Sequence, residues 1–229
     1  EEVPVIALVG EIFVRRDGLS RQHITELLAG EGFAVTCSPV GEWVLYTDYL
    51  VNNGLTSKMP GCLERLRLFV KQKYTAQRES TIKSILAQSG LIHASPVHVN
   101  AIVKAASDLV SPSLTGEAVL TVGSALMEIS SHACGVIGIG PFGCMPNRLS
   151  EAILTDNMNV KSVAEALGPN ALSRHSLIGN GPLPFLVIES DGSPFTQLLR
   201  AKLDAFCLSA RRLHARKMAF LHMDGGAPN

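Results

Sequence analysis

A short, continuous apolar run near the start of the chain sets the strongest limit on its fold. Residues 3–9 read Val-Pro-Val-Ile-Ala-Leu-Val and are bounded by Gly10. The run is too short for a helix and does not alternate, so it suits a strand buried on both faces, as in a parallel sheet. Three more short runs predict further strands. They are residues 33–37, 136–139 and 184–188.

Helical patterns fill the intervals between these strands. Ser20 is a good N-cap for a helix through Leu28, which makes the first β–α–β unit a right-handed crossover. Further helices are expected at residues 42–51, 63–74, 80–88, 97–110, 116–130, 147–154 and 160–167. A last long helix has Ser193 as its cap and Pro194 at its first position. Its apolar residues recur with a 3.6-residue period and form one stripe: Phe195, Leu199, Leu203, Phe206, Ala210 and Leu213. The sequence therefore predicts an α/β fold with a doubly wound, about four-stranded parallel sheet, Rossmann-like or flavodoxin-like.

The domain organisation follows from the part of the chain that lacks strand patterning. Residues 42–112 carry only helical patterns, among them Leu63, Leu66, Val70 and Tyr74 on one helix face. We expect a single Rossmann-like domain over residues 1–220 with a helical insertion at about 42–112. An independent helical domain is the alternative. Residues 221–229 are expected to form a disordered tail.

Composition excludes several classes of protein. The chain is 46% hydrophobic and 17% charged, with 20 basic and 20 acidic residues, which supports a core and argues against disorder. The neutral balance predicts no nucleic-acid partner. No apolar run approaches the ~18 residues of a membrane helix, so no membrane partner is expected. Five irregularly spaced cysteines do not suit a disulfide framework, and a cytoplasmic location is expected.

Polar and special residues gather after the predicted strands. Ligands of open parallel sheets bind beyond the carboxyl ends of the strands, so these residues are candidates for a ligand crevice. Glu189 and Asp191, the two acidic residues after the last strand, could act in proton transfer. The alternative is that they only form the turn before the last helix. The candidates are Gly10, Glu11, Gly140, Gly143, Glu189 and Asp191.

Cys144 stands in a loop rich in glycine and proline directly after the third predicted strand. Neighbouring glycines let backbone N–H groups approach a sulfide or another anion, and the following helix points its positive end at the thiol. Cys144 is therefore a candidate metal ligand or redox group. An inert thiol at a tight turn is the alternative, and the catalytic residues are unknown.

Several common motifs are missing or incomplete. No Cys-x-x-Cys pair occurs, which argues against a zinc ribbon or a thioredoxin-type site. Residues 138–143 match the letters of G-x-G-x-x-G, but Pro141 removes an amide that would bind phosphate. No Walker A sequence and no G-x-S-x-G elbow is present.

Four segments, in this order, carry a resemblance to a known family. They are residues 5–13, 138–147, 185–194 and 197–206, of which Gly-Pro-Phe-Gly-Cys-Met-Pro at 140–146 is the most specific. The chain resembles the 2-hydroxyglutaryl-CoA dehydratase D-component family, in its branch of acyl-CoA dehydratase activase-related proteins. The resemblance covers most of residues 3–215 and is weakest at 42–112.

The resemblance implies an iron–sulfur protein, with a cluster such as 4Fe–4S, that takes part in ATP-linked, low-potential electron transfer to acyl-CoA substrates. Cys144 matches the ligand cysteine of the family's C-terminal domain. The other ligands belong to upstream regions that have no match here, so the cluster is expected to be absent or incomplete in this chain. The implied partners are remaining domains of a longer chain or dehydratase and activator subunits, together with acyl-CoA.

We expect no turnover by this chain alone, because neither the full ligand set nor the ATP-binding motifs of the activator are present. The alternative function is a non-catalytic, Rossmann-like ligand-binding or protein-interaction module. In that reading, surface residues of the helical insertion make the contacts with a partner, and Cys144 does not.

Overall fold

The computed structural model describes residues 3–56, 61–88, 96–168 and 181–223. The chain divides into two compact units, one formed by residues 1–38 and 102–229 and the other by residues 39–101. The part of the expected tail from residue 224 onward lies outside the described residues. Residues 221–223 belong to the last helix, so that helix is longer than expected.

The first unit is built on a four-stranded parallel sheet with the strand order β2-β1-β3-β4. The strands are β1 (Val5–Gly10), β2 (Ala34–Cys37), β3 (Ala133–Pro141) and β4 (Phe185–Ser190). All three neighbouring pairs are parallel. This confirms the predicted α/β class, and β3 is longer at both ends than the predicted run.

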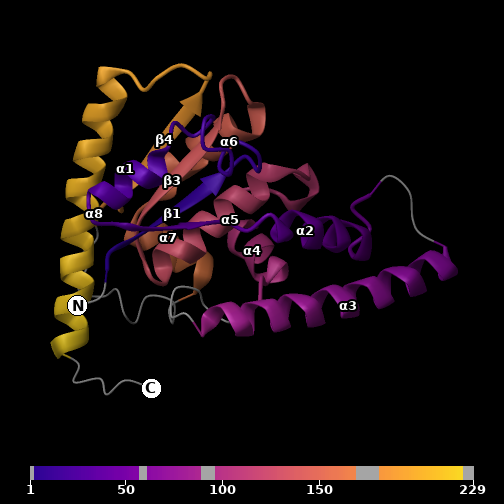
Figure 1. Ribbon diagram of the computed structural model, residues 1–229. Helices are drawn as coiled ribbons and strands as arrows, with labels where there is room; N and C mark the ends of the chain where they lie inside the picture. The colour runs from indigo at the N-terminus through magenta and orange to yellow at the C-terminus, as the bar shows by residue number, and fades with distance from the viewer. Residues whose placement is uncertain (1–2, 57–60, 89–95, 169–180, 224–229) are drawn as a thin grey trace. The chain divides into compact units, whose positions relative to one another are not determined.

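Helices cover both faces of the sheet, as the doubly wound class requires (Figure 1). The first face is covered by α1 (Ile24–Gly30) and α8 (Gln197–Met223), whose apolar side chains join one core cluster with the strands. The second is covered by α5 (Glu117–Ser130) and α6 (Met145–Asn157), and α7 (Val160–Leu167) contacts α5.

The predicted apolar stripe of the last helix is confirmed except at Phe195, which lies before the helix begins, and Leu199 is partly buried against the same core. Leu203, Phe206, Ala210 and Leu213 are buried in α8. Phe206 lies over Gly135 of β3, where an added Cβ would stand only 2.7 Å from the ring atom Cζ. The missing side chain at Gly135 thus makes room for the aromatic ring that joins α8 to the sheet.

The second unit contains α2 (Gly41–Asn52), α3 (Cys62–Ala87) and the start of α4 (Val99–Ala106). A short 3-10 helix, η1 (Pro112–Leu114), follows in the first unit. The two helices expected at 63–74 and 80–88 form one continuous helix, because residues 75–79 contain no glycine or proline to interrupt it. The assignment of the helical part as an insertion in one domain stays a prediction.

Two predicted helix caps are wrong. The first crossover helix begins at Ile24, and Ser20 instead donates its hydroxyl to the Asp17 carboxylate at 2.7 Å. The last helix begins at Gln197, so Ser193 does not cap it and Pro194 is not its first residue. Thr196 Oγ1 accepts a hydrogen bond from the N–H of Leu199 at 3.2 Å in that place.

Lys217 ties α8 to the connection between α5 and β3. Its ammonium group donates to the carbonyl oxygens of Ile129, Ser131 and Ala133 at 3.0, 3.2 and 2.7 Å. Carbonyls at the end of a helix have no partner within the helix, and a cation there also interacts favourably with the helix dipole. The Lys217 ammonium group therefore provides hydrogen-bond donors to carbonyl oxygens at the end of α5 and at the start of β3.

We predict that Lys217→Met lowers the free energy of unfolding by about 2 kcal/mol, because three carbonyl oxygens lose a charged donor while the aliphatic packing is kept. Denaturant titration followed by circular dichroism measures the change. Lys202→Met, on the exposed side of the same helix, is the control and should stay within about 0.5 kcal/mol of wild type. Equal losses in both variants would contradict the role given to Lys217.

Candidate functional site

The carboxyl ends of β1, β3 and β4 meet at one edge of the sheet. Gly10 pairs with Ile139, and Gly140 pairs with Glu189. Because β2 lies on one side of β1 and β3 on the other, the strand order reverses between β1 and β3. Ligands of parallel α/β sheets bind at such a reversal, so this edge is the candidate site.

Gly10 is explained by a close backbone contact between β1 and β3. Its φ is +114°, and an added Cβ would stand 2.0 Å from the carbonyl oxygen of Ile139. The same oxygen accepts a hydrogen bond from the N–H of Glu11 at 2.8 Å. No side chain fits at position 10, since both the dihedral angle and the backbone atoms exclude it.

Glu11 organises the turn that follows β1. Its carboxylate oxygen Oε2 accepts hydrogen bonds from the N–H groups of Phe13 and Val14 at 3.0 and 2.7 Å. Arg15 is buried beneath this turn and donates to the carbonyl oxygen of Gly10 at 2.7 Å. The two charged side chains therefore hold the β1–α1 loop against the end of β1.

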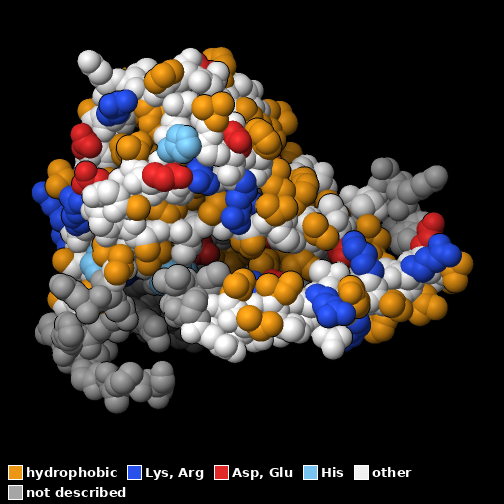
Figure 2. Space-filling model, in the orientation of Figure 1, with side chains coloured by type: hydrophobic (Ala, Val, Ile, Leu, Met, Phe, Trp, Pro, Cys, Tyr) orange, Lys and Arg blue, Asp and Glu red, His pale blue; other side chains and the backbone are white. Residues whose placement is uncertain are grey.

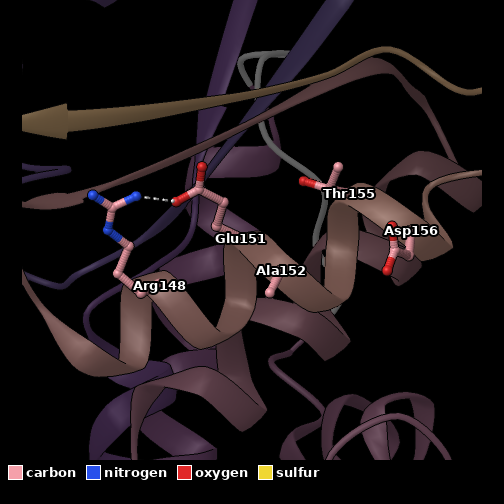
Figure 3. A pocket seen from close by; sticks show the side chains of 5 residues that line it. All are labelled: Arg148, Glu151, Ala152, Thr155 and Asp156. Atoms are coloured by element: carbon pink, nitrogen blue, oxygen red, sulfur yellow. Dashed lines mark hydrogen bonds and ion pairs between the residues drawn. The ribbon is translucent and has the colours of Figure 1, made fainter.

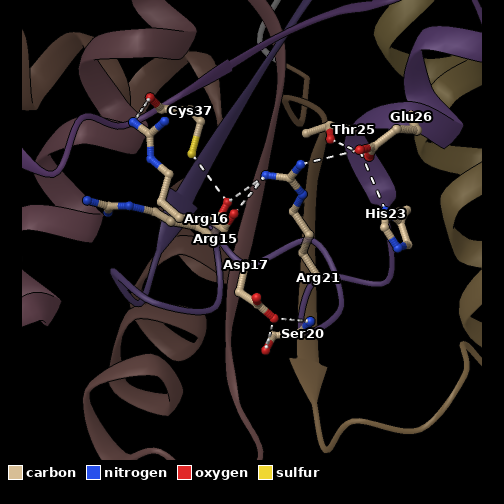
Figure 4. A network of polar contacts seen from close by, with 9 residues as sticks. All are labelled: Arg15, Arg16, Asp17, Ser20, Arg21, His23, Thr25, Glu26 and Cys37. Carbon is tan, nitrogen blue, oxygen red and sulfur yellow. Dashed lines mark hydrogen bonds and ion pairs between the residues drawn. The ribbon is translucent and has the colours of Figure 1, made fainter.

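One arginine side chain also ties this loop to the end of β2 (Figure 4). Arg16 donates to the carbonyl oxygens of Cys37 and Ser38 at 3.1 and 2.8 Å. The Cys37 thiol donates to the backbone carbonyl of Arg15 at 3.5 Å, a long contact. Cys37 is thus part of a structural network at the edge of the sheet.

The sequence did not point to Glu117, which also lies at this edge. Its Oε1 accepts a hydrogen bond from the N–H of Ile12 at 3.1 Å, between positions 105 residues apart. Burial raises the pKa of the Glu117 carboxyl, and the nearby Glu11 carboxylate acts in the same direction. No local pattern predicts such a contact, because it depends on the packing of α5 against β1.

Cys144 is the N-cap residue of α6. Its N–H donates to the carbonyl oxygen of Pro141 at 3.1 Å, and Gly143 takes the positive φ of +73° that the turn requires. The thiol is half-buried and makes no capping hydrogen bond to the helix. A thiol at this place has access to an external ligand and faces the positive end of the α6 dipole.

Asn147, which sequence reasoning did not single out, fills the space above Gly140. A Cβ at Gly140 would stand 2.5 Å from Cγ of Asn147, so the glycine makes room for this amide. Asn147 is only 6% exposed, and its Nδ2 has no hydrogen-bond partner among the described residues. A buried amide donor without a partner costs free energy. The predicted role of Gly140, to let backbone amides approach a ligand, stays a prediction.

Glu189 is paired with a cation that the sequence analysis missed. Nε of Arg148, in the first turn of α6, lies 2.7 Å from Oε1 of Glu189, and Nη1 lies 3.3 Å from Oε2 of Glu151. Beyond this pair, a shallow hollow follows one face of α6 (Figure 3). Its lining residues all belong to that helix: Arg148, Glu151, Ala152, Thr155 and Asp156. A hollow made by one helix alone does not enclose a small molecule.

Asp191 serves the turn after β4. Its carboxylate accepts a hydrogen bond from the N–H of Ser193 at 2.8 Å, and this bond holds the pKa of Asp191 below its ordinary value. The contact is the one expected from the simpler of the two sequence interpretations. Proton transfer by Asp191 or Glu189 stays a prediction.

The other cysteines do not complete a metal site with Cys144. Cys134 is buried at the start of β3 and donates to the carbonyl of Val5 at 3.2 Å, and burial raises its thiol pKa to about 11. Burial also raises the pKa of Cys207 in α8, while Cys62 is exposed at the start of α3. Within the described ranges, no group of three or more His, Cys, Asp or Glu residues is placed to hold a metal ion.

This arrangement gives a direct test of fit for an iron–sulfur cluster. A cluster takes about four ligands, mostly thiolates. At this end of the sheet the described part of the chain has two half-buried thiols, Cys144 and Cys37, and the Cys37 thiol is hydrogen-bonded to the carbonyl oxygen of Arg15. The described residues therefore offer Cys144 as the thiol without a capping hydrogen bond, and they do not hold a cluster by themselves.

Comparison of the chain with protein-family models, with curated proteins and with solved structures finds no match. None of the described helices is long and apolar enough to cross a membrane.

We predict that Gly140→Ala lowers the free energy of unfolding by about 2 kcal/mol, because the new methyl group overlaps the Asn147 amide. Adding Asn147→Ala should recover at least about 1 kcal/mol of that loss, a coupling that a double-mutant cycle measures. Gly143→Ala is the control. It is strained by its own positive φ and touches no neighbouring atom, so Asn147→Ala should not rescue it. Additive losses in the Gly140 cycle would contradict the contact.

Proposed function

We propose that this chain is a domain of an iron–sulfur protein of the 2-hydroxyacyl-CoA dehydratase and activase type, to which it supplies Cys144 as one cluster ligand. The remaining ligands come from other segments or subunits. The function is ATP-linked, low-potential electron transfer to acyl-CoA substrates.

The observation that carries the proposal is the position of Cys144. The thiol follows the third strand at the sheet edge where such folds bind ligands, it is half-buried, and it makes no bond to the helix it caps. Cys134 and Cys207 contrast with it, because they are buried in the core. The sequence Gly-Pro-Phe-Gly-Cys-Met-Pro at 140–146 adds the family resemblance.

The bound cluster would supply one-electron transfer at low potential. This chain's own residues would hold and position one corner of it. Gly143 sets the turn that presents the thiol, and α6 points its positive end at the same place. The Arg148–Glu189 pair fixes the start of α6 against β4.

The closest test is the iron content of the longest natural chain that contains these residues, purified without oxygen. We expect Cys144→Ala to lower bound iron and acid-labile sulfide by about tenfold or more and to remove the charge-transfer absorbance, because a thiolate ligand is lost. Cys62→Ala is the matched control, since it removes an exposed thiol on another element.

The two variants should fold equally well by circular dichroism. Unchanged iron in Cys144→Ala would contradict the proposal and favour the non-catalytic module. An equal loss of iron in both variants would also contradict the specific role of Cys144.

A further inference from the structure

Helix α3 exposes an apolar stripe along its first half. The helix has 26 residues, Cys62–Ala87, and none of them is buried. The side chains of the stripe are 58–63% exposed: Leu63, Leu66, Val70 and Tyr74. Figure 2 shows hydrophobic and cationic side chains next to each other over this helix. Contiguous exposed apolar side chains of this kind mark interaction surfaces.

Polar contacts attach α3 to its own unit. Lys71 Nζ lies 2.7 Å from the buried Asp48 carboxylate of α2. Glu79 accepts a hydrogen bond from the N–H of Val97 at 2.9 Å and pairs with Lys83 at 3.1 Å. Charged side chains of α3 make these contacts, whereas the four side chains of the apolar stripe are exposed.

The four stripe residues have the spacing of a helix-docking seam, and Phe69, which is also exposed, lies beside them beyond Lys73 by helical position. Positions 63, 66, 70 and 74 follow steps of three and four residues, and at 100° per residue they span an arc of about 80°. A seam of this width suits one partner helix. A helix that lies in a lipid surface has its charges on the side opposite its apolar face, whereas Lys73 lies between Leu66 and Phe69 by helical position.

The charge of α3 indicates which kind of partner helix would bind it. Within α3, six lysine and arginine residues stand against two glutamates, whereas the whole chain is neutral. Arg67 and Arg78 lie on one side of the stripe and Lys73 on the other, by helical position. Lys73 and Arg78 contact aromatic rings on α3 and form no ion pair in the described part of the chain. A second copy of α3 would bring like charges together, so an acidic partner is favoured.

We propose that α3 docks an acidic amphipathic helix of another protein. Apolar side chains of that helix cover Leu63, Leu66, Val70 and Tyr74, and its flanking carboxylates pair with Arg67, Lys73 and Arg78. This surface is independent of Cys144, so the proposal holds or fails separately from the iron–sulfur proposal.

The test uses two synthetic heptad peptides as probes of this chemistry. Both carry leucine at the a and d positions, and they differ only in having glutamate or lysine at e and g. We expect the full chain to bind the glutamate peptide at least about tenfold more tightly than the lysine peptide in fluorescence anisotropy, and the difference to shrink at high salt.

Variants locate the binding surface. The double change Leu66→Gln with Val70→Gln should weaken binding of the glutamate peptide by about tenfold or more, because two apolar anchors are lost. The matched control is Leu198→Gln with Leu208→Gln, two leucines exposed on α8, and it should bind like wild type. Unchanged helix content by circular dichroism shows that the variants are folded.

Three results would overturn the proposal. The first is equal or absent binding of the two peptides. The second is self-association of the chain in analytical ultracentrifugation that the α3 double variant abolishes, which would assign the stripe to a second copy. The third is binding to vesicles containing phosphatidylserine, lost in the same variant, without binding to the glutamate peptide.

Discussion

The candidate site depends on the close backbone contact between the ends of β1 and β3. Gly10 brings the chain so near Ile139 that even a methyl group at position 10 would overlap the carbonyl oxygen. Because Gly10 and Glu11 lie against the backbone of Ile139, the β1–α1 loop changes direction directly after β1. Glu11 and Arg15 make that turn with hydrogen bonds to the backbone. The start of the β1–α1 loop is thus held in place by Gly10, Glu11 and Arg15.

A second close contact positions the thiol. Gly140 admits the Asn147 amide, so the first turn of α6 packs directly on β3 and Cys144 becomes the residue that caps the helix. Arg148 then reaches Glu189 of the neighbouring strand. The loop that carries Cys144 is held at both sides, while its thiol stays partly open to solvent. Such fixed presentation suits a ligand shared with another protein segment.

The sequence predicts the features that depend on periodicity. The apolar run at 3–9 and the stripe containing Leu203 and Phe206 suffice to place a parallel sheet under a long helix, since burial follows a local pattern. The role of Asn147 and the contact of Glu117 depend on distances between segments far apart in the chain, which no local pattern contains. Thr196 replaced the predicted cap because several residues before α8 satisfy the same local preference.

The central claim is that Cys144 binds iron shared with other protein segments. The most direct measurement is X-ray absorption at the selenium edge, which identifies the atoms bonded to selenium. The sample is the Cys144→Sec variant of the longest natural chain that contains these residues, purified without oxygen. The account predicts that the selenium has an iron atom bonded to it in addition to its own side-chain carbon. A selenium spectrum with carbon as its only neighbour, in protein that contains iron, would contradict it.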